Sequence, residues 1–448
     1  MKYCRLVFLV LIFFLTCASP AAALTPLERL QIHRLRATHE AIETLAGQWH
    51  AVPIASGFRD IRAALHVHSS LSHDSNAKLE EILPAAKAAG VNAILFTEHP
   101  SARFDYFSDG HRGLHDGVLL VPGAETEGLL LFPTHSMAGD QPTGDQPARA
   151  QALVDPATRG GGLAFLSHLE ARMQWNLQHL TGSEIYNTHG DLKLHGRFID
   201  FVSPLALALL MSGLEHYPQE TLAAFQHYPD HYLRRYDELC QSGRLTGVAA
   251  CDAHHNQVYR IVVSAKGDYD VVDFRGMRVI SLPGAVATAV LKPATARPAA
   301  GTVVWKADLD PYERLLRHVT THLLVEELSH DGVWQALGEG RAYVGFDWMA
   351  DPTGFIFQAE MAAQRRPLGS EVVLGREIAQ DGGLVLRAAA PLPCRLKLLR
   401  DGHEIDRHDG DQAAWPIHQA GVYRVEAWLD LAGELRPWIL ANPIYVRQ

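Results

Sequence analysis

The chain has 448 residues, 47% of them hydrophobic and 20% charged, and its 50 acidic residues outnumber its 40 basic ones to give a net charge of −10. This length and apolar content can provide a large hydrophobic core on which the fold can rest. An acidic chain is a poor candidate for sequence-independent binding to nucleic acid, which needs a basic surface, so small-molecule substrates are favoured.

Residues 1–23 have the layout of a secretory signal peptide. A short basic start precedes an apolar run from Leu6 to Leu15, and three alanines that end at Ala23 form a cleavage site of small residues. The run is too short to be a good transmembrane anchor, and no other stretch is long enough to span a membrane. The sequence therefore predicts a periplasmic or secreted protein. The alternative, a lipoprotein attached through Cys17, is disfavoured because Thr16 stands where a smaller residue is usual.

Cleavage near Ala23 would leave 38 basic and 50 acidic residues and an odd number of cysteines. At most one disulfide can then form within the chain, so the fold must depend on its core. The remaining cysteines are Cys240, Cys251 and Cys394.

Residues 24–57 are predicted to form an N-terminal helical segment. Thr25 and Glu28 have the spacing of a capping box, with Pro26 at the first helical position. Leucine and isoleucine residues then recur at helical spacing until Gly47. We expect one amphipathic helix that packs on the outside of the domain that follows it.

The most informative segment of the chain runs from Leu65 to Ser75. His66 and His68 alternate as residues on one face of a β-strand do, so both imidazoles would point at one place. His73 and Asp74 follow directly. Imidazole nitrogens and carboxylate oxygens gathered in this way are typical ligands of a divalent transition metal.

Three later apolar segments also end in residues of the ligand type. In an α/β barrel or a doubly wound sheet the carboxyl ends of parallel strands gather at one face, so residues that follow such strands can converge. The segments are 91–97, which ends at Glu98 and His99, 162–167, which ends at His168, and 245–251, which ends at Asp252 and His254.

A helix is predicted between the first two of these strands. Asn76 can cap it, it would run from Leu79 to Ala89, and Gly90 would stop it, which makes a short βαβ unit. Pro84 is tolerable in this helix only near its start.

Taken in this order, the motifs resemble those of the polymerase and histidinol phosphatase (PHP) superfamily of metal-dependent hydrolases, from about Arg62 to about Phe346. His66, His68 and Asp74 match the first motif, and His99 matches the second, in which Glu98 replaces the usual aspartate. The resemblance extends to later motifs, which are Glu125 with Glu127 as its rival, His135 as a further ligand, His168, the strand 182–187, and the pair Asp252 and His254.

The resemblance implies a distorted seven-stranded β/α barrel with two or three divalent ions. It implies ligands in three sets: His66, His68, Glu125 and Asp252 for one ion, Asp74, His99 and His254 for a second, and Glu125, His135 and His168 for a third. Such ligands admit zinc, manganese or iron.

Weaker candidates surround these ligands. His73 and Arg172 are candidate catalytic residues that could donate a proton or hold a substrate anion, and His189 and His255 are further possibilities of the same kind. For each of them a surface or supporting role is the simpler interpretation.

The composition changes after the catalytic domain, which we place at residues 58–350. Short alternating strands with turns between them, at 355–357, 383–387, 395–399 and 422–428, predict a small antiparallel β-sandwich over 351–448.

The leading prediction of function is a phosphoesterase in which a hydroxide held by the metal ions attacks phosphorus. The first alternative is hydrolysis of a carboxylic ester or a carbamate on the same site, since secreted proteins of this layout also resemble the carbaryl-hydrolase-like branch. A second alternative, from another class, is a binding protein in which the β-sandwich attaches to glycan or a partner and the metal domain is idle.

Overall fold

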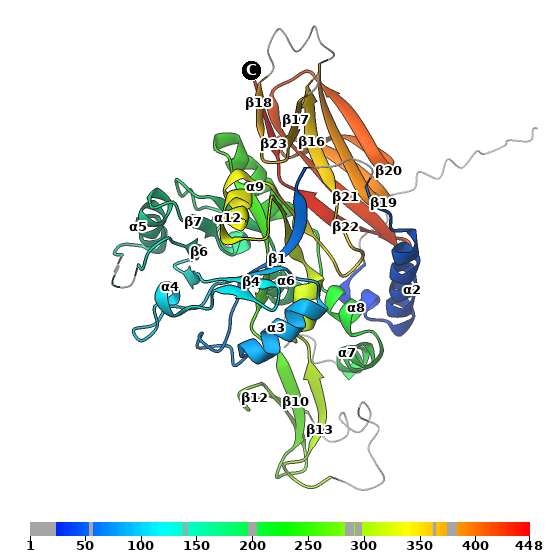
Figure 1. The fold of residues 1–448 in the computed structure, drawn as a ribbon. Helices are drawn as coiled ribbons and strands as arrows, with labels where there is room; N and C mark the ends of the chain where they lie inside the picture. Colours follow the sequence, from blue (N-terminus) through cyan, green and yellow to red (C-terminus); the bar gives the residue numbers. More distant parts are fainter. Residues whose placement is uncertain are drawn as a thin grey trace, which may run out of the picture.

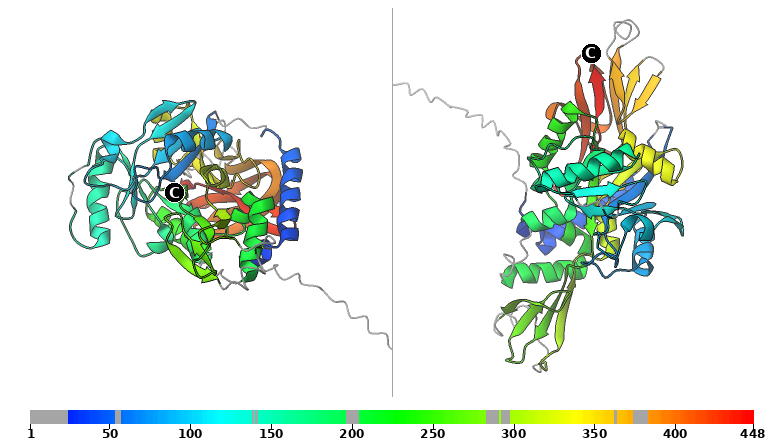
Figure 2. Two further views of the ribbon diagram at one scale, coloured as in Figure 1. Left: turned by 90° about the horizontal axis from the view of Figure 1, so that it is seen from below. Right: turned by 90° about the vertical axis from the view of Figure 1, so that its left-hand side faces the viewer.

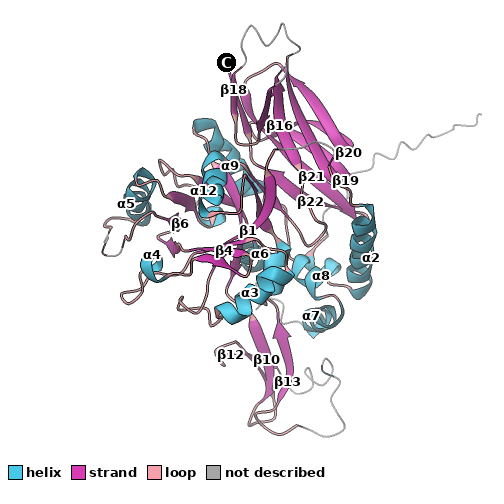
Figure 3. Ribbon diagram, viewed as in Figure 1, coloured by secondary structure: helices cyan, strands magenta, loops and turns pink. Residues whose placement is uncertain are grey.

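The computed structural model describes residues 24–52, 57–137, 139, 142–195, 204–282, 291, 298–361, 364–373 and 383–448. Within them the chain forms a central α/β domain, a C-terminal region built of strands, and a small sheet that projects from the domain (Figures 1 and 3). The small sheet and the C-terminal strands lie at opposite ends of the molecule, as the side view in Figure 2 also shows. The predicted signal peptide, with Cys17, lies outside the described residues. None of the described helices is long and apolar enough to cross a membrane.

The N-terminal segment contains two helices where the sequence predicted one. The capping box is confirmed, since the Thr25 hydroxyl accepts from the Glu28 amide and the Thr25 amide donates to the Glu28 carboxylate at 2.8 Å. However, α1 (Pro26–Arg29) and α2 (Ile32–Gln48) are separated by Leu30 and Gln31, and the backbone of Gln31 is extended. The break lets Leu30 and Arg29 both turn inward.

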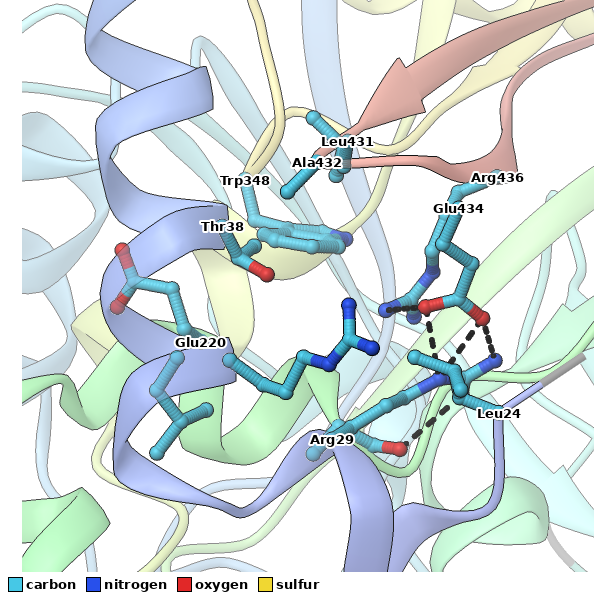
Figure 4. A pocket seen from close by; sticks show the side chains of 12 residues that line it. Leu24, Arg29, Thr38, Glu220, Trp348, Leu431, Ala432, Glu434 and Arg436 are labelled. Atoms are coloured by element: carbon cyan, nitrogen blue, oxygen red, sulfur yellow. Dashed lines mark hydrogen bonds and ion pairs between the residues drawn. The ribbon is translucent and has the colours of Figure 1, made fainter.

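Arg29 attaches this segment to two parts of the fold. Its guanidinium forms an ion pair with Glu434 at 2.6 Å and donates to the carbonyls of Ala224 and Gln226 at 3.1 and 2.7 Å. Figure 4 shows this ion pair beside Trp348. The segment therefore bridges the α/β domain and the C-terminal strands.

The α/β domain is built on a parallel sheet. The strands that carry the predicted site residues run in the same direction, so their carboxyl ends lie at the same end of the sheet. Strands pair in the order β4, β2, β1, β9, β8, β7, all parallel, and β6 and β5 continue antiparallel from β7. An isolated parallel bridge between Glu98 and Ala124 relates the end of β2 to β5. The bounds are β1 (Arg59–Val67), β2 (Ala93–Phe96), β4 (Val118–Val121), β5 (Ala124–Thr126), β6 (Leu129–Phe132), β7 (Leu163–Leu166), β8 (Gly182–Asn187) and β9 (Thr246–Ala253). The mixed α/β class is confirmed, and a seven-stranded barrel stays a prediction.

Short strands and helices complete the domain. Those that surround the sheet are β3 (Gly113–His115), α3 (Leu79–Ala88), α4 (Tyr106–Asp109), α5 (Gln146–Arg159), η1 (Leu169–Ala171), α6 (Thr188–His195), α7 (Pro204–His216), α8 (Pro218–Ala223), α9 (Asp230–Ser242), α11 (Tyr312–His318) and α12 (His330–Glu339).

The predicted cap of α3 is wrong. The helix begins at Leu79, preceded by Lys78, and no side chain caps it. The chain before it is held in a loop, because the Ser75 hydroxyl donates to the His254 carbonyl at 2.9 Å and the Ser70 amide donates to the Ala77 carbonyl at 2.6 Å. These bonds keep Asn76 out of the cap position.

Both faces of β1 are buried. Ile61, Ala63 and Leu65 pack with the neighbouring strands in one apolar cluster, whereas Ala64 and Val67 pack against α3 and α11 in another. At the start of the strand, β14 (Thr320–Val325) and β15 (Ala342–Gly345) add antiparallel pairs.

His322 of β14 is buried between two carboxylates at this opposite end of β1. Its Nδ1 lies 2.9 Å from Asp60 Oδ1 and its Nε2 lies 3.1 Å from Asp347 Oδ1. Burial disfavours the charged imidazole, but the two carboxylates outweigh it and raise the pKa of His322 to about 9. The interaction fixes the start of β1, away from the predicted site.

The C-terminal region consists of strands, as predicted, but it is continuous with the sheet of the α/β domain. β22 pairs antiparallel with β15, and Asn442 donates to the carbonyls of Gly247 and Ala342 at 3.0 and 2.7 Å. The division after residue 350 therefore stays a prediction. The strands are β16 (Ile356–Met361), β17 (Gln364–Pro367), β18 (Glu371–Val373), β19 (Leu384–Arg400), β20 (His403–Ile417), β21 (Gly421–Leu431), β22 (Glu434–Ala441) and β23 (Ile444–Arg447).

Two strands that the sequence predicted separately, at 383–387 and 395–399, are one strand, β19. Its pairing with β20 is interrupted between Ala389 and Cys394, where Pro391 and Pro393 cannot donate to the ladder. The interruption explains why the sequence pattern suggested two elements.

A four-stranded antiparallel sheet is inserted directly after β9, and the sequence did not predict it as a separate unit. Its strand order is β12, β11, β10, β13. One of its faces packs around Ile261, Tyr269 and Leu282. The bounds are β10 (Val258–Val263), β11 (Tyr269–Val272), β12 (Arg278–Leu282) and β13 (Val303–Asp308).

Candidate metal centre

Residues at the ends of β1, β2, β7 and β9, or directly after them, meet at the carboxyl end of the parallel sheet, as the sequence predicted. Their side chains form overlapping groups in which one ligand atom from each residue lies within 4.8 Å of the others. The groups are His68 with Asp74, His99 and His254; His66 with Glu125 and His168; His66 with His68 and Asp252; and His189 with Asp252 and His254.

Backbone conformation aims three of these side chains. His66, His168 and Asp252 have φ values of 60°, 46° and 50°, in the left-handed region that side chains with a Cβ rarely adopt. At His66 this conformation interrupts the alternation of β1, because Ala64 and Val67 face the same helices although they are three residues apart. Strain of this kind is typical of functional sites, where the surrounding fold holds it.

Two carboxylates occupy the centre of the group. Glu125 Oε2 lies 3.1 Å from His66 Nε2 and 3.6 Å from His68 Nε2, while its Oε1 lies 3.5 Å from His168 Nε2. Asp252 Oδ1 lies 3.4 Å from His66 Nε2, and its Oδ2 lies 3.5 Å from His168 Nε2. A carboxylate with histidines on both oxygens has the arrangement that bridges two ions.

The third carboxylate forms a separate corner of the site. Asp74 Oδ2 lies 3.3 Å from His99 Nε2 and 3.3 Å from His254 Nε2. Burial tends to raise the pKa of Asp74, but hydrogen bonds from His254 and His99 outweigh it and hold that pKa well below the usual range. Asp74 is therefore ionised at neutral pH.

A second layer of glutamates orients the histidines. Glu184 accepts from His66 Nδ1 at 2.6 Å with Oε1 and from the His168 amide at 2.7 Å with Oε2. Glu170 accepts from His168 Nδ1 at 2.8 Å. Such partners fix the tautomer of a ligating histidine, so that its other nitrogen is left free to bind a metal.

Glu98, whose role the sequence left open, supports the loop after β1. It is buried, and it accepts from the Ser69 amide and hydroxyl at 3.0 and 2.6 Å and from the Ser72 hydroxyl at 2.6 Å. Its carboxylate is thus occupied by the loop between His68 and Asp74, and it does not belong to the ligand groups.

Buried polar atoms without partners point to metal ions. His66 Nε2, His68 Nε2, Asp74 Oδ1 and Asp252 Oδ2 are buried and have no hydrogen-bond partner within the described part of the chain. A buried polar atom without a partner costs about 1–3 kcal/mol, so four of them in one place would be a large penalty unless a ligand satisfies them. Imidazole nitrogen and carboxylate oxygen are donors that divalent transition metals accept.

The charges at the site lead to the same inference. Burial lowers the pKa of His168, but the hydrogen bond to Glu170 and the charges of Glu184 and Asp252 outweigh it and raise this pKa to about 9. Burial and the neighbouring histidines lower the pKa of His68 well below its usual value, so His68 is neutral. The buried carboxylates of the site thus favour positive charge beside them, but His68 is not protonated and does not supply it. Divalent ions would supply that charge.

The cluster is most exposed on the side of Asp74 and His99. The side chains of His66 and His68 are 0% exposed and that of Asp252 is 2% exposed, whereas Asp74 and His99 are 23% and 25% exposed. His73 is exposed next to them, with its ring centroid 4.9 Å from that of His99. Substrate would therefore approach from the side of Asp74 and His99, and His73 lies at that entrance.

His135 is not brought into the cluster. It follows β6, which runs antiparallel to β7 so that Phe132 lies opposite Leu163 while Leu129 lies opposite Leu166. The carboxyl end of β6 therefore lies beside the start of β7, whereas His168 follows the end of β7. His135 is exposed there, beside Gly160.

Arg172 and Glu127 are engaged outside the cluster. Arg172 donates to the carbonyl of Ser167 at 3.0 Å, and its guanidinium lies over the ring of Trp175 at 5.2 Å from the centroid. Glu127 forms an ion pair with Arg149 at 2.9 Å, which leaves Glu125 as the carboxylate in the site. Arg172 thus supports the backbone next to His168.

His189 and His255, the two remaining candidates, have different positions. His189 Nδ1 lies 3.4 Å from Asp252 Oδ2, and His189 belongs to one of the ligand groups. His255 lies between Glu81 and Asp308, at 2.5 and 3.1 Å, outside the groups. Sequence reasoning ranked these two alike, because only the start of α6 directly after β8 brings His189 to the site.

Comparison with known proteins assigns this part of the chain. Residues 64–270 match the sequence profile of the PHP domain. This segment is a PHP domain. The PHP domain and the gathered ligand atoms together indicate a metal-dependent hydrolase, and they agree with the resemblance found in the motifs.

Solved structures add little to this assignment. A two-domain protein from Bacteroides vulgatus that contains a predicted PHP-like metal-dependent phosphoesterase is 13% identical, with 88% of this chain and 98% of that chain covered and a TM-score of 0.35. An engineered protein is 14% identical over 92% of this chain and 90% of its own, with a TM-score of 0.15. Similarities at this level do not establish a shared function. No curated protein matches the chain.

Proposed function

We propose that the protein is a metal-dependent phosphoesterase that acts outside the cytoplasm on a small-molecule substrate. The observation that carries the proposal is the set of buried, unpartnered histidine nitrogens and carboxylate oxygens at the end of the parallel sheet. Divalent ions held there would lower the pKa of a bound water and stabilise negative charge on the attacked ester. The side chains of the protein would supply the remaining functions, which are to hold the ions, to orient the ligands and to assist the leaving group.

The structure supports a division of the ligands between ions. His66, His68, Glu125 and Asp252 would hold one ion, and Asp74, His99 and His254 a second. Glu125 and His168 would face a third, and His189 joins the site through Asp252. His135 has no part in the proposal, for the reason given by the direction of β6.

Charge favours a phosphoester over a neutral ester. Three carboxylates, Asp74, Glu125 and Asp252, face the ion positions, so three divalent ions with one bound hydroxide would leave these groups with a net positive charge, and two ions would leave them neutral. A phosphoryl group carries the negative charge that such a site neutralises, whereas a carboxylic ester or a carbamate does not. The outer glutamates Glu184 and Glu170 are paired with imidazoles and contribute less to this balance.

Each residue then has a defined task. Glu184 holds the His66 ring, and Glu98 holds the loop that presents Asp74. The closed side excludes water behind His66 and His68. His73, at the entrance, is placed to donate a hydrogen bond to the leaving group, and it is the candidate for that role that the geometry favours.

Hydrolysis assays with and without chelation test the proposal. The purified mature protein is incubated with p-nitrophenyl phosphate, bis-p-nitrophenyl phosphate and p-nitrophenyl acetate. We expect chelator-sensitive release from one or both phosphates and loss of this release in His66→Ala, with the fold retained. Cleavage of the acetate alone would favour the ester or carbamate alternative. Full activity of His66→Ala would refute the site.

A further inference from the structure

The inserted sheet differs in charge from the rest of the chain. Residues 258–308 contain seven lysines and arginines and four aspartates, although the whole chain has 40 basic and 50 acidic residues. Three of the four aspartates have side chains that are engaged within the sheet or at its base. Asp270 accepts from Ser281 at 2.6 Å, Asp273 from the Met277 amide at 2.8 Å, and Asp308 from Lys306 at 3.3 Å.

Strand register collects three of the basic side chains in one row. Arg260 lies opposite Val272 on β11 and opposite Lys306 on β13, and Val272 lies opposite Arg278 on β12. Residues opposite one another in an antiparallel sheet point to the same face. Arg278, Arg260 and Lys306 therefore cross one face of the sheet, while Ile261 and Tyr269 pack on the other.

This basic row is accessible. Arg278 is exposed, and no ion pair of Arg278 occurs among the residues that the structure describes. Lys306 has a side chain that is 56% exposed. Arg260 donates to the Asp273 carbonyl at 3.3 Å, and its Nε is buried without a partner. Lys306 is paired with Asp308 at 3.3 Å, whereas neither Arg260 nor Arg278 forms an ion pair within the described residues, so the row keeps positive charge that the sheet does not neutralise.

The base of the sheet is fixed to the open side of the metal site. Asn256, two residues after His254, donates to the carbonyl of Asp74 at 3.2 Å. His255 contacts Asp308, which is on the same face as Lys306, and also Glu81 of α3. The sheet projects from this end of the domain (Figures 1 and 2). Its basic face therefore begins beside Asp74, where the cluster is most exposed.

The metal site lacks basic side chains of its own. Among the described residues, the ion pairs of its carboxylates involve histidines only, and Arg172 is engaged elsewhere. We propose that Arg260, Arg278 and Lys306 bind a second anionic group of the substrate, a phosphate or a carboxylate remote from the ester that is cleaved. The substrate class is then an elongated molecule with at least two anionic groups. This inference rests on the proposed function, since the first anionic group must sit at the metal site.

Binding of matched phosphonates tests the inference without turnover. Arg260 is six positions after His254, so the Cα atoms of the two residues are at most about 20 Å apart along an extended chain. Calorimetry on the metal-loaded full-length protein compares alkyl phosphonates with alkane bisphosphonates of four, eight and twelve carbons. We expect the longer bisphosphonates to bind roughly tenfold more tightly than monophosphonates of the same length.

Variants assign the gain to the row. Arg278→Glu should reduce the ratio of the two affinities to about one, and Arg278→Gln combined with Lys306→Gln should do the same without adding an acid. Lys266→Glu, in the turn at the far end of the sheet, makes the same change of charge and should leave the ratio unchanged. Equal affinities at every length in the natural protein, or a ratio that the row variants do not change, would overturn the inference. Absence of metal-dependent binding of either ligand would instead contradict the proposed function.

Discussion

Glu184 should control metal affinity without touching a metal ion. It is 1% exposed, and its two oxygens accept from His66 Nδ1 at 2.6 Å and from the His168 amide at 2.7 Å. In Glu184→Gln one oxygen becomes an amide nitrogen, which places a donor opposite a donor. A buried donor left unpaired costs about 1–3 kcal/mol, and loss of a second-layer partner lowers metal affinity by about 10- to 100-fold.

The assay separates affinity from folding. Competition with a fluorescent chelator gives the dissociation constant of the most tightly held ion, and thermal unfolding in excess chelator gives the stability of the metal-free protein. We expect Glu184→Gln to weaken metal binding by at least tenfold, whereas Glu170→Gln, which affects only His168, should have a smaller effect. Metal affinity equal to that of the natural protein in Glu184→Gln would refute the orienting role.

Three further predictions follow from the geometry. His168→Ala should lose an ion and most phosphatase activity, whereas His135→Ala should retain both. Elemental analysis and turnover measurements compare the two variants. Equal losses in both would contradict our placement of His135. His322 has a folded pKa of about 9, above the value of about 6.5 in an unfolded chain. Its stabilising effect is complete below about pH 6.5 and is lost as pH rises toward 9, which corresponds to on the order of 3 kcal/mol. Urea unfolding should show this loss in the natural protein and not in His322→Gln, and parallel curves would contradict it. A chain that ends at Asp351 should fail to fold, because it lacks β22 and Asn442; circular dichroism tests this, and a folded, active truncation would contradict it.

The strand ends were predictable because their chemistry is local. His66 and His68 on one strand, and Asp252 with His254 on another, are spaced so that a parallel sheet brings them together, and the structure does so. At His66 the sequence predicted the right position for a different reason. The left-handed backbone, and not simple alternation along the strand, turns this side chain into the site.

Residues whose place depends on strand direction were not predictable. The position of His135 was inferred from a motif. Because β6 runs antiparallel to β7, His135 lies at the opposite end of these strands from His168. His189 was undervalued, because its approach to Asp252 depends on how α6 leaves β8.

Supporting residues and the inserted sheet left weak signals in the sequence. Glu184 lies in a segment that was noted only as a motif, and nothing local indicates that its carboxylate would face His66. The sheet between β9 and α11 has alternating residues that were absorbed into the catalytic domain, and its basic row appears only once the register is known. The link between β15 and β22 joins segments about a hundred residues apart, and no local pattern reveals it.

Metal content tests the central claim most directly. Elemental analysis of the purified mature protein, together with His66→Ala and Asp252→Ala as matched variants, measures the ions per chain without any assumption about substrate. The account predicts two or three zinc, manganese or iron ions per natural chain and a loss of ions in both variants that retain the fold. A natural protein that is folded and holds no divalent metal, even after incubation with each of these ions, would contradict it.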